Sequence, residues 1–188
     1  IWLSKENKKF ADDILGERMA QALIIIGPTA NWGAKIWEAE RFSNLVHLLT
    51  SNFRSLQSAM IAVVGGPGEE LIAKPILDAI PSGRRLDLVG AIPFLDVAAV
   101  LERATLYIGN DSGLMHLSAA VGAPTLGLFG PTREANYRPW PPRRGSQALS
   151  GRHYCCDFSG AAGVLSHPRA CDIIAPRVVR SRPHNCCL

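Results

Sequence analysis

Residues 21–28 read Gln21-Ala22-Leu23-Ile24-Ile25-Ile26-Gly27-Pro28, an apolar run that stops at Gly-Pro. An unbroken run rich in β-branched residues is typical of a strand that is buried on both faces. Such strands belong to parallel sheets whose two faces are covered by helices. This segment therefore predicts an inner strand of an α/β sheet.

A buried strand followed by an amphipathic helix recurs along the chain. Apolar residues at helical spacing predict a helix from Trp37 to about Ser51, and further helices are expected from Glu69, over 93–103 and over 113–121. The further strands are expected at 61–64, 86–89, 105–108 and 125–129. This βαβαβαβαβ order with short connections predicts a doubly wound, Rossmann-like α/β fold, because each crossover between parallel strands needs a helix.

Bulk composition fits a soluble globular domain. The chain has 188 residues, of which 47% are hydrophobic and 19% charged. No apolar run approaches the roughly 20 residues of a membrane-spanning helix. Residues 1–20 open without an initiator Met or a signal-peptide pattern, so we expect them to be a fragment of a linker or of a preceding domain.

Positive charge and cysteine are concentrated at the end of the chain. The net charge is +4, but residues 1–132 hold 11 basic and 13 acidic residues, whereas 133–188 hold nine Arg and three acids. All five cysteines lie within 155–187. We therefore expect 141–188 to be an atypical Arg/Pro/Cys-rich tail, with a composition compatible with poor order and suggestive of a reading-frame shift.

The same tail argues against several classes of partner. Its arginines are not interleaved with aromatic residues on a periodic face, so we expect no nucleic-acid partner. Its cysteines have neither CxxC spacing nor an even number, so we expect no metal site, and a reduced cytoplasmic compartment fits best.

The loops that follow the expected strands all contain glycine, and ligands of such sheets bind beyond the carboxyl ends of the strands. In 109–113, a Gly-Asn-Asp-Ser-Gly loop leads into a helix whose free N–H groups attract phosphate. Ser112 adds a hydroxyl donor, and His116 lies one turn into the helix on the same side. Asp111 would repel phosphate, so it is expected to cap the helix or to hold a loop amide or hydroxyl. Together with Thr132 at the neighbouring strand end, the pattern favours an anion site over a well-capped turn with a core histidine.

Several motifs resemble the C-terminal half of the glycosyltransferase family 9 heptosyltransferases, inverting enzymes of lipopolysaccharide assembly. The resemblance extends over about 22–140. Its motifs are Lys35-Ile36-Trp37-Glu38-Ala39-Glu40-Arg41-Phe42, Gly65-Gly66-Pro67-Gly68-Glu69-Glu70, Asp111-Ser112-Gly113-Leu114-Met115-His116-Leu117-Ser118-Ala119-Ala120, Gly122-Ala123-Pro124-Thr125 and Leu128-Phe129-Gly130-Pro131-Thr132.

The resemblance implies that 21–140 is a nucleotide-sugar-binding domain, the C-terminal half of a GT-B fold, with ADP-heptose or a related nucleotide sugar as donor and no cofactor. Lys35 would lie near the donor phosphates with Thr29 beside it. Ser112-Gly113 and His116 would hold the departing diphosphate. Glu69 or Glu70 would accept hydrogen bonds from the ribose hydroxyls.

The resemblance also implies that this chain would lack the acceptor-binding domain of the family. Family members bind the lipid A-core acceptor and supply the general base from an N-terminal domain, so no catalytic residue is expected here, and the chain alone should bind donor but transfer poorly. The full enzyme would work in the cytoplasm, with peripheral association at the inner membrane. Two alternatives stay open: a non-catalytic nucleotide-sugar-binding module, and the nucleotide domain of another sugar-nucleotide enzyme. The second is less favoured, because the first loop lacks GxGxxG.

Overall fold

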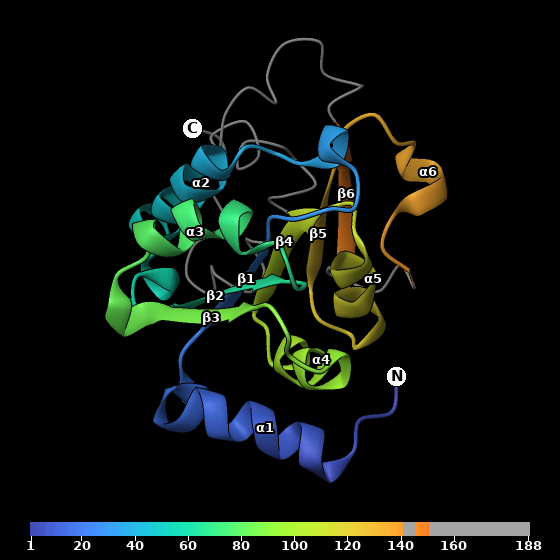
Figure 1. Ribbon diagram of the computed structural model, residues 1–188. Coiled ribbons are helices and arrows are strands. Elements are labelled where there is room, and N and C mark those ends of the chain that lie inside the picture. The colour runs from blue at the N-terminus through green and yellow to red at the C-terminus, as the bar shows by residue number, and fades with distance from the viewer. Residues whose placement is uncertain (141–145, 151–188) are drawn as a thin grey trace, which may run out of the picture.

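The structure is a computed structural model that describes residues 1–140 and 146–150, and it is built on one parallel sheet of six strands in the order β3-β2-β1-β4-β5-β6 (Figure 1). The strands are β1 Leu23–Gly27, β2 Met60–Gly65, β3 Arg85–Val89, β4 Leu106–Asn110, β5 Thr125–Phe129 and β6 Ser146–Ser150. Every neighbouring pair runs parallel. The predicted doubly wound α/β fold is confirmed.

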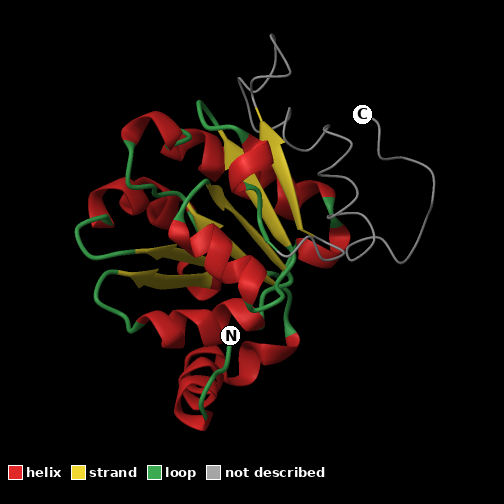
Figure 2. Cartoon of the chain, turned by 90° about the vertical axis from the view of Figure 1, so that its right-hand side faces the viewer, coloured by secondary structure: helices red, strands yellow, loops and turns green. Residues whose placement is uncertain are grey.

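Helices cover both faces of this sheet (Figure 2). They are α1 Lys5–Leu15, α2 Ala39–Asn52, α3 Glu70–Ala79, α4 Phe94–Glu102, α5 Gly113–Ala120 and the short α6 Glu134–Tyr137. Single 3₁₀ turns lie at η1 Gly16–Ala20, η2 Gly33–Lys35, η3 Arg54–Leu56 and η4 Ser82–Arg84. None of these helices is long and apolar enough to cross a bilayer, as far as the described residues go.

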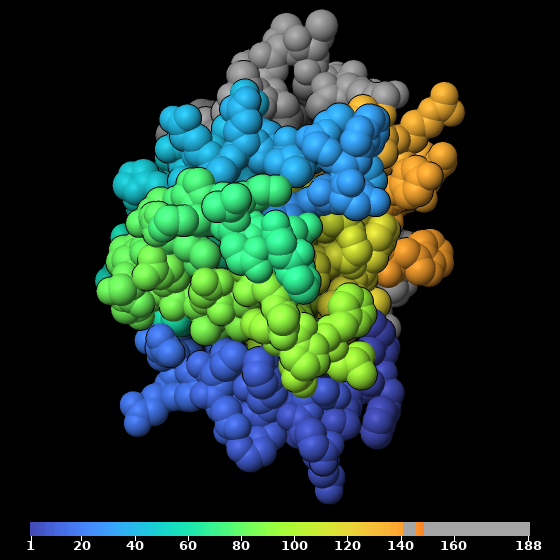
Figure 3. All heavy atoms as spheres, in the orientation of Figure 1, coloured from blue at the N-terminus to red at the C-terminus, as the bar shows by residue number. Residues whose placement is uncertain are grey.

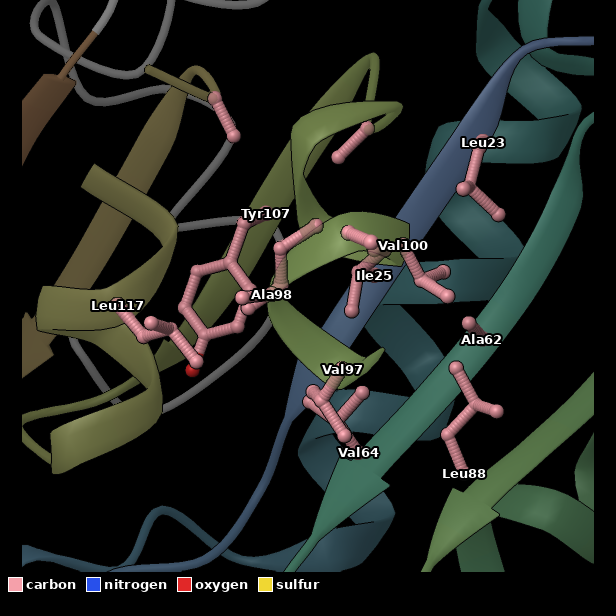
Figure 4. Packing of buried hydrophobic residues seen from close by; sticks show 14 of the residues in the cluster. Leu23, Ile25, Ala62, Val64, Leu88, Val97, Ala98, Val100, Tyr107 and Leu117 are labelled. Carbon is pink, nitrogen blue, oxygen red and sulfur yellow. The ribbon is translucent and has the colours of Figure 1, made fainter. Parts of the chain in front are cut away.

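Successive side chains of each strand point to opposite faces of the sheet, and this divides the core into two clusters. Ile24 and Ile26 of β1 pack with α2 and α3, while Ile25 of the same strand packs with α4 and α5 on the opposite face. Figure 4 shows the second cluster, in which Ile25 lies beside Val100. The continuous apolar sequence of β1 predicted that both of its faces would be buried, and all five of its residues are buried.

Three of these helices and strands were not predicted: α1, the short α6 and β6. Helix α1 has a capping box between Ser4 and Asn7, and it packs against the outer side of α4, where the side-chain amide of Asn7 donates to Asp96 over 2.8 Å. Strand β6 extends the sheet beyond β5. The rest of the expected tail, with its five cysteines, lies outside the described residues.

The strand order places one crevice at the centre of the sheet. From β1 the chain winds outward through β2 to β3, and it then crosses to β4 on the other side of β1. The loops that leave β1 and β4 therefore diverge to opposite faces, which is where doubly wound folds bind ligands.

Candidate functional site

Asn110, the last residue of β4, joins the two loops that border the central crevice. Its side chain is fully buried; Nδ2 donates to the carbonyl oxygen of Pro28 over 2.7 Å, and Oδ1 accepts from the backbone N–H of Trp37 over 3.2 Å. The loop after β1 is therefore held at a fixed distance from the start of α5. The role of Asn110 was not predicted, because its contacts depend on the pairing of β1 with β4.

Asp111 joins a third loop to this pair. Its carboxylate is 4% exposed; Oδ2 forms an ion pair with Lys35 Nζ at 2.9 Å and accepts from Thr132 Oγ1 over 2.7 Å. Lys35 Nζ also lies 5.8 Å from the ring centroid of Tyr137 in α6. The expectation that Asp111 holds a loop hydroxyl is confirmed by its bond with Thr132. The other expectation, a helix cap, is not met, since the N-cap of α5 is Ser112.

These contacts bring together the ends of β1, β4 and β5. In Figure 3, atoms of the loop after β1 adjoin those of α5 and α6 on one face of the molecule. Thr29, in the same loop, is 2% exposed, and Gly130 is close enough to Ala34 that an added Cβ would lie 3.1 Å from its carbonyl oxygen. The structure therefore gathers Thr29, Lys35 and Thr132 around the start of α5.

Within residues 1–140 and 146–150, no side chain caps the N-terminus of α5, so this helix end is open. Ser112 makes no side-chain capping bond, and no acidic residue stands in the first turn. A Cβ added to Gly113 would meet no heavy atom within 4 Å, and His116, one turn on, is partly exposed. First-turn N–H groups without side-chain partners carry the positive end of the helix dipole. This end of α5 is suited to an anion.

Glu69 and Glu70 lie at the neighbouring end of β2, apart from the Lys35–Asp111 pair. Glu69 Oε2 accepts from the N–H of Gly66 over 2.7 Å, and Glu70 Oε1 accepts from the N–H of Gly68 over 3.2 Å. One oxygen of each carboxylate thus fixes its own loop. Each has a second oxygen, and Glu69 is only partly exposed while Glu70 is exposed.

Unpartnered polar atoms gather around the same crevice. Among the described residues, the buried side-chain nitrogen and oxygen atoms without a hydrogen-bond partner are Trp37 Nε1, Arg84 Nη2, Tyr107 Oη and Ser112 Oγ. Three of them border the crevice: Trp37 lies in the loop after β1, Tyr107 in β4, and Ser112 directly before α5. Because buried polar groups are normally hydrogen-bonded, this concentration points to a ligand site.

Tyr107 was expected only as part of a buried strand. Burial raises the pKa of its hydroxyl; the nearby Ser112 hydroxyl opposes this effect, and the charge of Glu69 adds to it. The Ser112 hydroxyl is thus close enough to affect the pKa of Tyr107, although neither oxygen has a hydrogen-bond partner of ordinary geometry among the described residues.

This raised pKa predicts a loss of stability in alkali. The unfolded chain would release the Tyr107 proton near the usual value of about 10, while the folded chain retains it, so the contribution is complete below that pH and is lost above it. We expect the free energy of unfolding of wild type, minus that of Tyr107→Phe, to be constant up to about pH 9 and to fall as the pH passes about 10. Urea denaturation of both chains across this range measures the difference. A difference that stays flat to pH 11 would contradict the burial of this hydroxyl.

Comparisons with known proteins point to one family. The model of glycosyltransferase family 9 (heptosyltransferase) matches residues 1–157. Lipooligosaccharide heptosyltransferase 2 of Haemophilus influenzae is 32% identical over 134 residues, which are 69% of this chain and 36% of that protein. Lipopolysaccharide heptosyltransferase 3 of Escherichia coli is 29% identical over 124 residues, 65% of this chain and 35% of the relative.

Solved structures show the same fold. ADP-heptose lipopolysaccharide heptosyltransferase II of E. coli superposes with a TM-score of 0.65 at 21% identity, covering 79% of this chain and 44% of that one. The E. coli heptosyltransferase WaaC with ADP also gives 0.65, at 22% identity, over 82% of this chain and 46% of that one. The chain thus spans about a third of the curated relatives and less than half of these structures. With a family model matched over most of its length, the chain belongs to glycosyltransferase family 9, the heptosyltransferases.

Proposed function

We propose that this chain binds a nucleotide sugar, ADP-heptose, in the crevice between β1 and β4, as the donor-binding half of an inverting heptosyltransferase. The observation that carries the proposal is the open N-terminus of α5, where Ser112 Oγ is buried and has no partner among the described residues. Helix N-termini of this kind bind phosphate groups. Two solved structures of one similar protein, the E. coli heptosyltransferase WaaC, are described as holding ADP and ADP-2-deoxy-2-fluoro heptose.

In this proposal the diphosphate lies against the first turn of α5. Ser112 and the first N–H groups donate to it, and His116 approaches from the next turn. Asp111 does not repel the ligand, because Lys35 and Thr132 occupy its carboxylate. An ammonium group has three protons, so Lys35 can hold Asp111 and still donate to a phosphate oxygen. As the glycosidic bond breaks, these donors stabilise the charge that develops on the leaving diphosphate.

The ribose would be held at the end of β2. Glu69 uses Oε2 for its own loop, which leaves Oε1 to accept from a ribose hydroxyl. Glu70 has the same arrangement with the opposite oxygen free, but it is more exposed. Glu69 is therefore the better candidate of the two.

Transfer requires a base within hydrogen-bond reach of the acceptor hydroxyl. The described carboxylates of the site have other roles in this proposal: Asp111 pairs with Lys35, and Glu69 and Glu70 each hold their own loop with one oxygen and face the ribose with the other. We therefore propose that a lipopolysaccharide inner-core acceptor and the base are held by a further domain, at the cytoplasmic face of the inner membrane. Isolated, this chain would bind donor without efficient transfer.

The test is ADP binding. At an ADP concentration 100 times the Kd, binding adds about 2.7 kcal/mol to stability, which for a chain of this size raises Tm by roughly 5–10 °C. Replacing His116 by alanine removes one donor to the phosphates, and we expect about tenfold weaker binding. Titration calorimetry and thermal denaturation measure both quantities.

His47→Ala is the matched control. His47 is an exposed histidine of α2, so its loss should leave the ADP affinity unchanged. The proposal fails if millimolar ADP leaves the Tm of wild type where it was. The role of His116 fails separately if the two histidine variants bind ADP equally well.

A further inference from the structure

Tyr107 is directed along its strand toward the proposed donor site. Residues 107 and 109 of β4 share one face, and Gly109 pairs in register with Gly27 of β1. A Cβ added to either glycine would collide with the hydroxyl oxygen of Tyr107. The ring therefore occupies the space above both glycines and brings its hydroxyl to the carboxyl end of the sheet. Figure 4 shows this ring between α4 and α5, beside Ala98 and Leu117.

The hydroxyl itself is not needed for this packing. Tyr107 is fully buried, and its oxygen has no hydrogen-bond partner among the described residues. Burying a hydroxyl without a partner destabilises the fold, and phenylalanine would fill the same space without that cost. A tyrosine at this position is therefore unfavourable for the ligand-free fold.

Ser112 is the natural partner for this group. It is the N-cap residue of α5, yet its buried Oγ makes no capping bond and has no hydrogen-bond partner within the part of the chain that the structure describes. It lies close enough to Tyr107 to lower the pKa of that hydroxyl against the effect of burial. Two buried, unpartnered hydroxyls thus lie next to each other at the open end of the helix.

We infer that Tyr107 is a positioning residue that orients the Ser112 hydroxyl toward the ligand. When an anion occupies the start of α5, Tyr107 O–H donates to Ser112 Oγ, and Ser112 O–H donates to a phosphate oxygen. A serine hydroxyl can accept and donate at once, and each bond in such a chain polarises the next. The inference rests on the proposed function, since it needs a phosphate group at this site.

The experiment is a double-mutant cycle on ADP affinity, with Tyr107→Phe, Ser112→Ala and the double variant of the whole chain. We expect Tyr107→Phe to weaken ADP binding about fivefold and Ser112→Ala about tenfold, the usual scale of one hydrogen bond. In the Ser112→Ala background, Tyr107→Phe should have no further effect, because the residue acts only through Ser112. In Ser112→Thr, which keeps the hydroxyl, the fivefold effect should return.

Stability gives a readout that a structural role would not produce. Without ADP, we expect Tyr107→Phe to melt at or above the Tm of wild type, since no native hydrogen bond is lost. The inference would be overturned if Tyr107→Phe bound ADP as tightly as wild type. It would also be overturned if Tyr107→Phe weakened ADP binding equally with Ser112 present and in the Ser112→Ala background. Either result would leave the proposed function intact. If wild type itself does not bind ADP, the proposed function is what fails.

Discussion

Replacing Asp111 by alanine is expected to lower the free energy of unfolding by about 3 kcal/mol, because it leaves a largely buried cation without its carboxylate. The side chains of Asp111 and Lys35 are only 4% and 16% exposed. Asp111 also accepts from Thr132, so the substitution releases the loops after β1 and β5 from the start of α5. Urea denaturation of the ligand-free chain measures the loss.

The double variant separates the ion pair from other effects. If Asp111→Ala and Lys35→Met each destabilise the fold by leaving the other charge unpaired, the double variant should be less destabilised than the sum of the two single variants. We expect this difference to be at least about 1 kcal/mol. Lys74 and Asp78 of α3 provide the matched pair: their charged atoms lie 2.8 Å apart, close to the 2.9 Å of Lys35 and Asp111, but the side chains are 67% and 56% exposed. Asp78→Ala should change stability by less than about 0.5 kcal/mol. Similar costs for both aspartates would mean that the Lys35–Asp111 pair is not structural.

The fold could be predicted where burial determines residue type. Strands β1, β2, β4 and β5 are buried along their length, and their mostly apolar sequences, rich in β-branched residues in β1 and β2, predict this burial. Strand β6 was missed because Ser146–Ser150 has no β-branched residue, and its place depends on pairing with β5. Helix α1 was missed because its capping box has Asn7 where Glu or Gln is usual.

The site could be predicted by location better than by contacts. Glycine-containing loops at the ends of parallel strands pointed to the edge where the structure brings Lys35, Asp111 and Thr132 together, and Ser112 and Gly113 stand at the helix start as expected. The contacts of Asn110 and the Lys35–Asp111 pair depend on the strand order, which places β4 beside β1 although β2 and β3 come between them in the chain. Local patterns carry no information about that order.

Gly109→Ala is the second substitution with a large expected effect, a loss of about 2–3 kcal/mol through overpacking. Its Cβ would collide with the Tyr107 hydroxyl and would lie 2.6 Å from the carbonyl oxygen of Gly27. The side chain can move, but the carbonyl belongs to the backbone of β1, which is paired in register with Gly109 itself. The midpoint of urea denaturation measures the loss. Gly83→Ala is the control, since its Cβ would meet nothing within 4 Å.

Gly27→Ala tests the same packing from the adjacent strand. The three atoms nearest to its added Cβ all belong to Tyr107. Shortening that side chain with Tyr107→Leu should therefore recover part of the stability lost in Gly27→Ala, but little of that lost in Gly109→Ala, where the backbone collision persists. Equal recovery in both would mean that the side chain alone limits the space at Gly109. If Gly109→Ala is as stable as Gly83→Ala, the ring of Tyr107 does not occupy the space above these glycines, and its hydroxyl cannot reach Ser112.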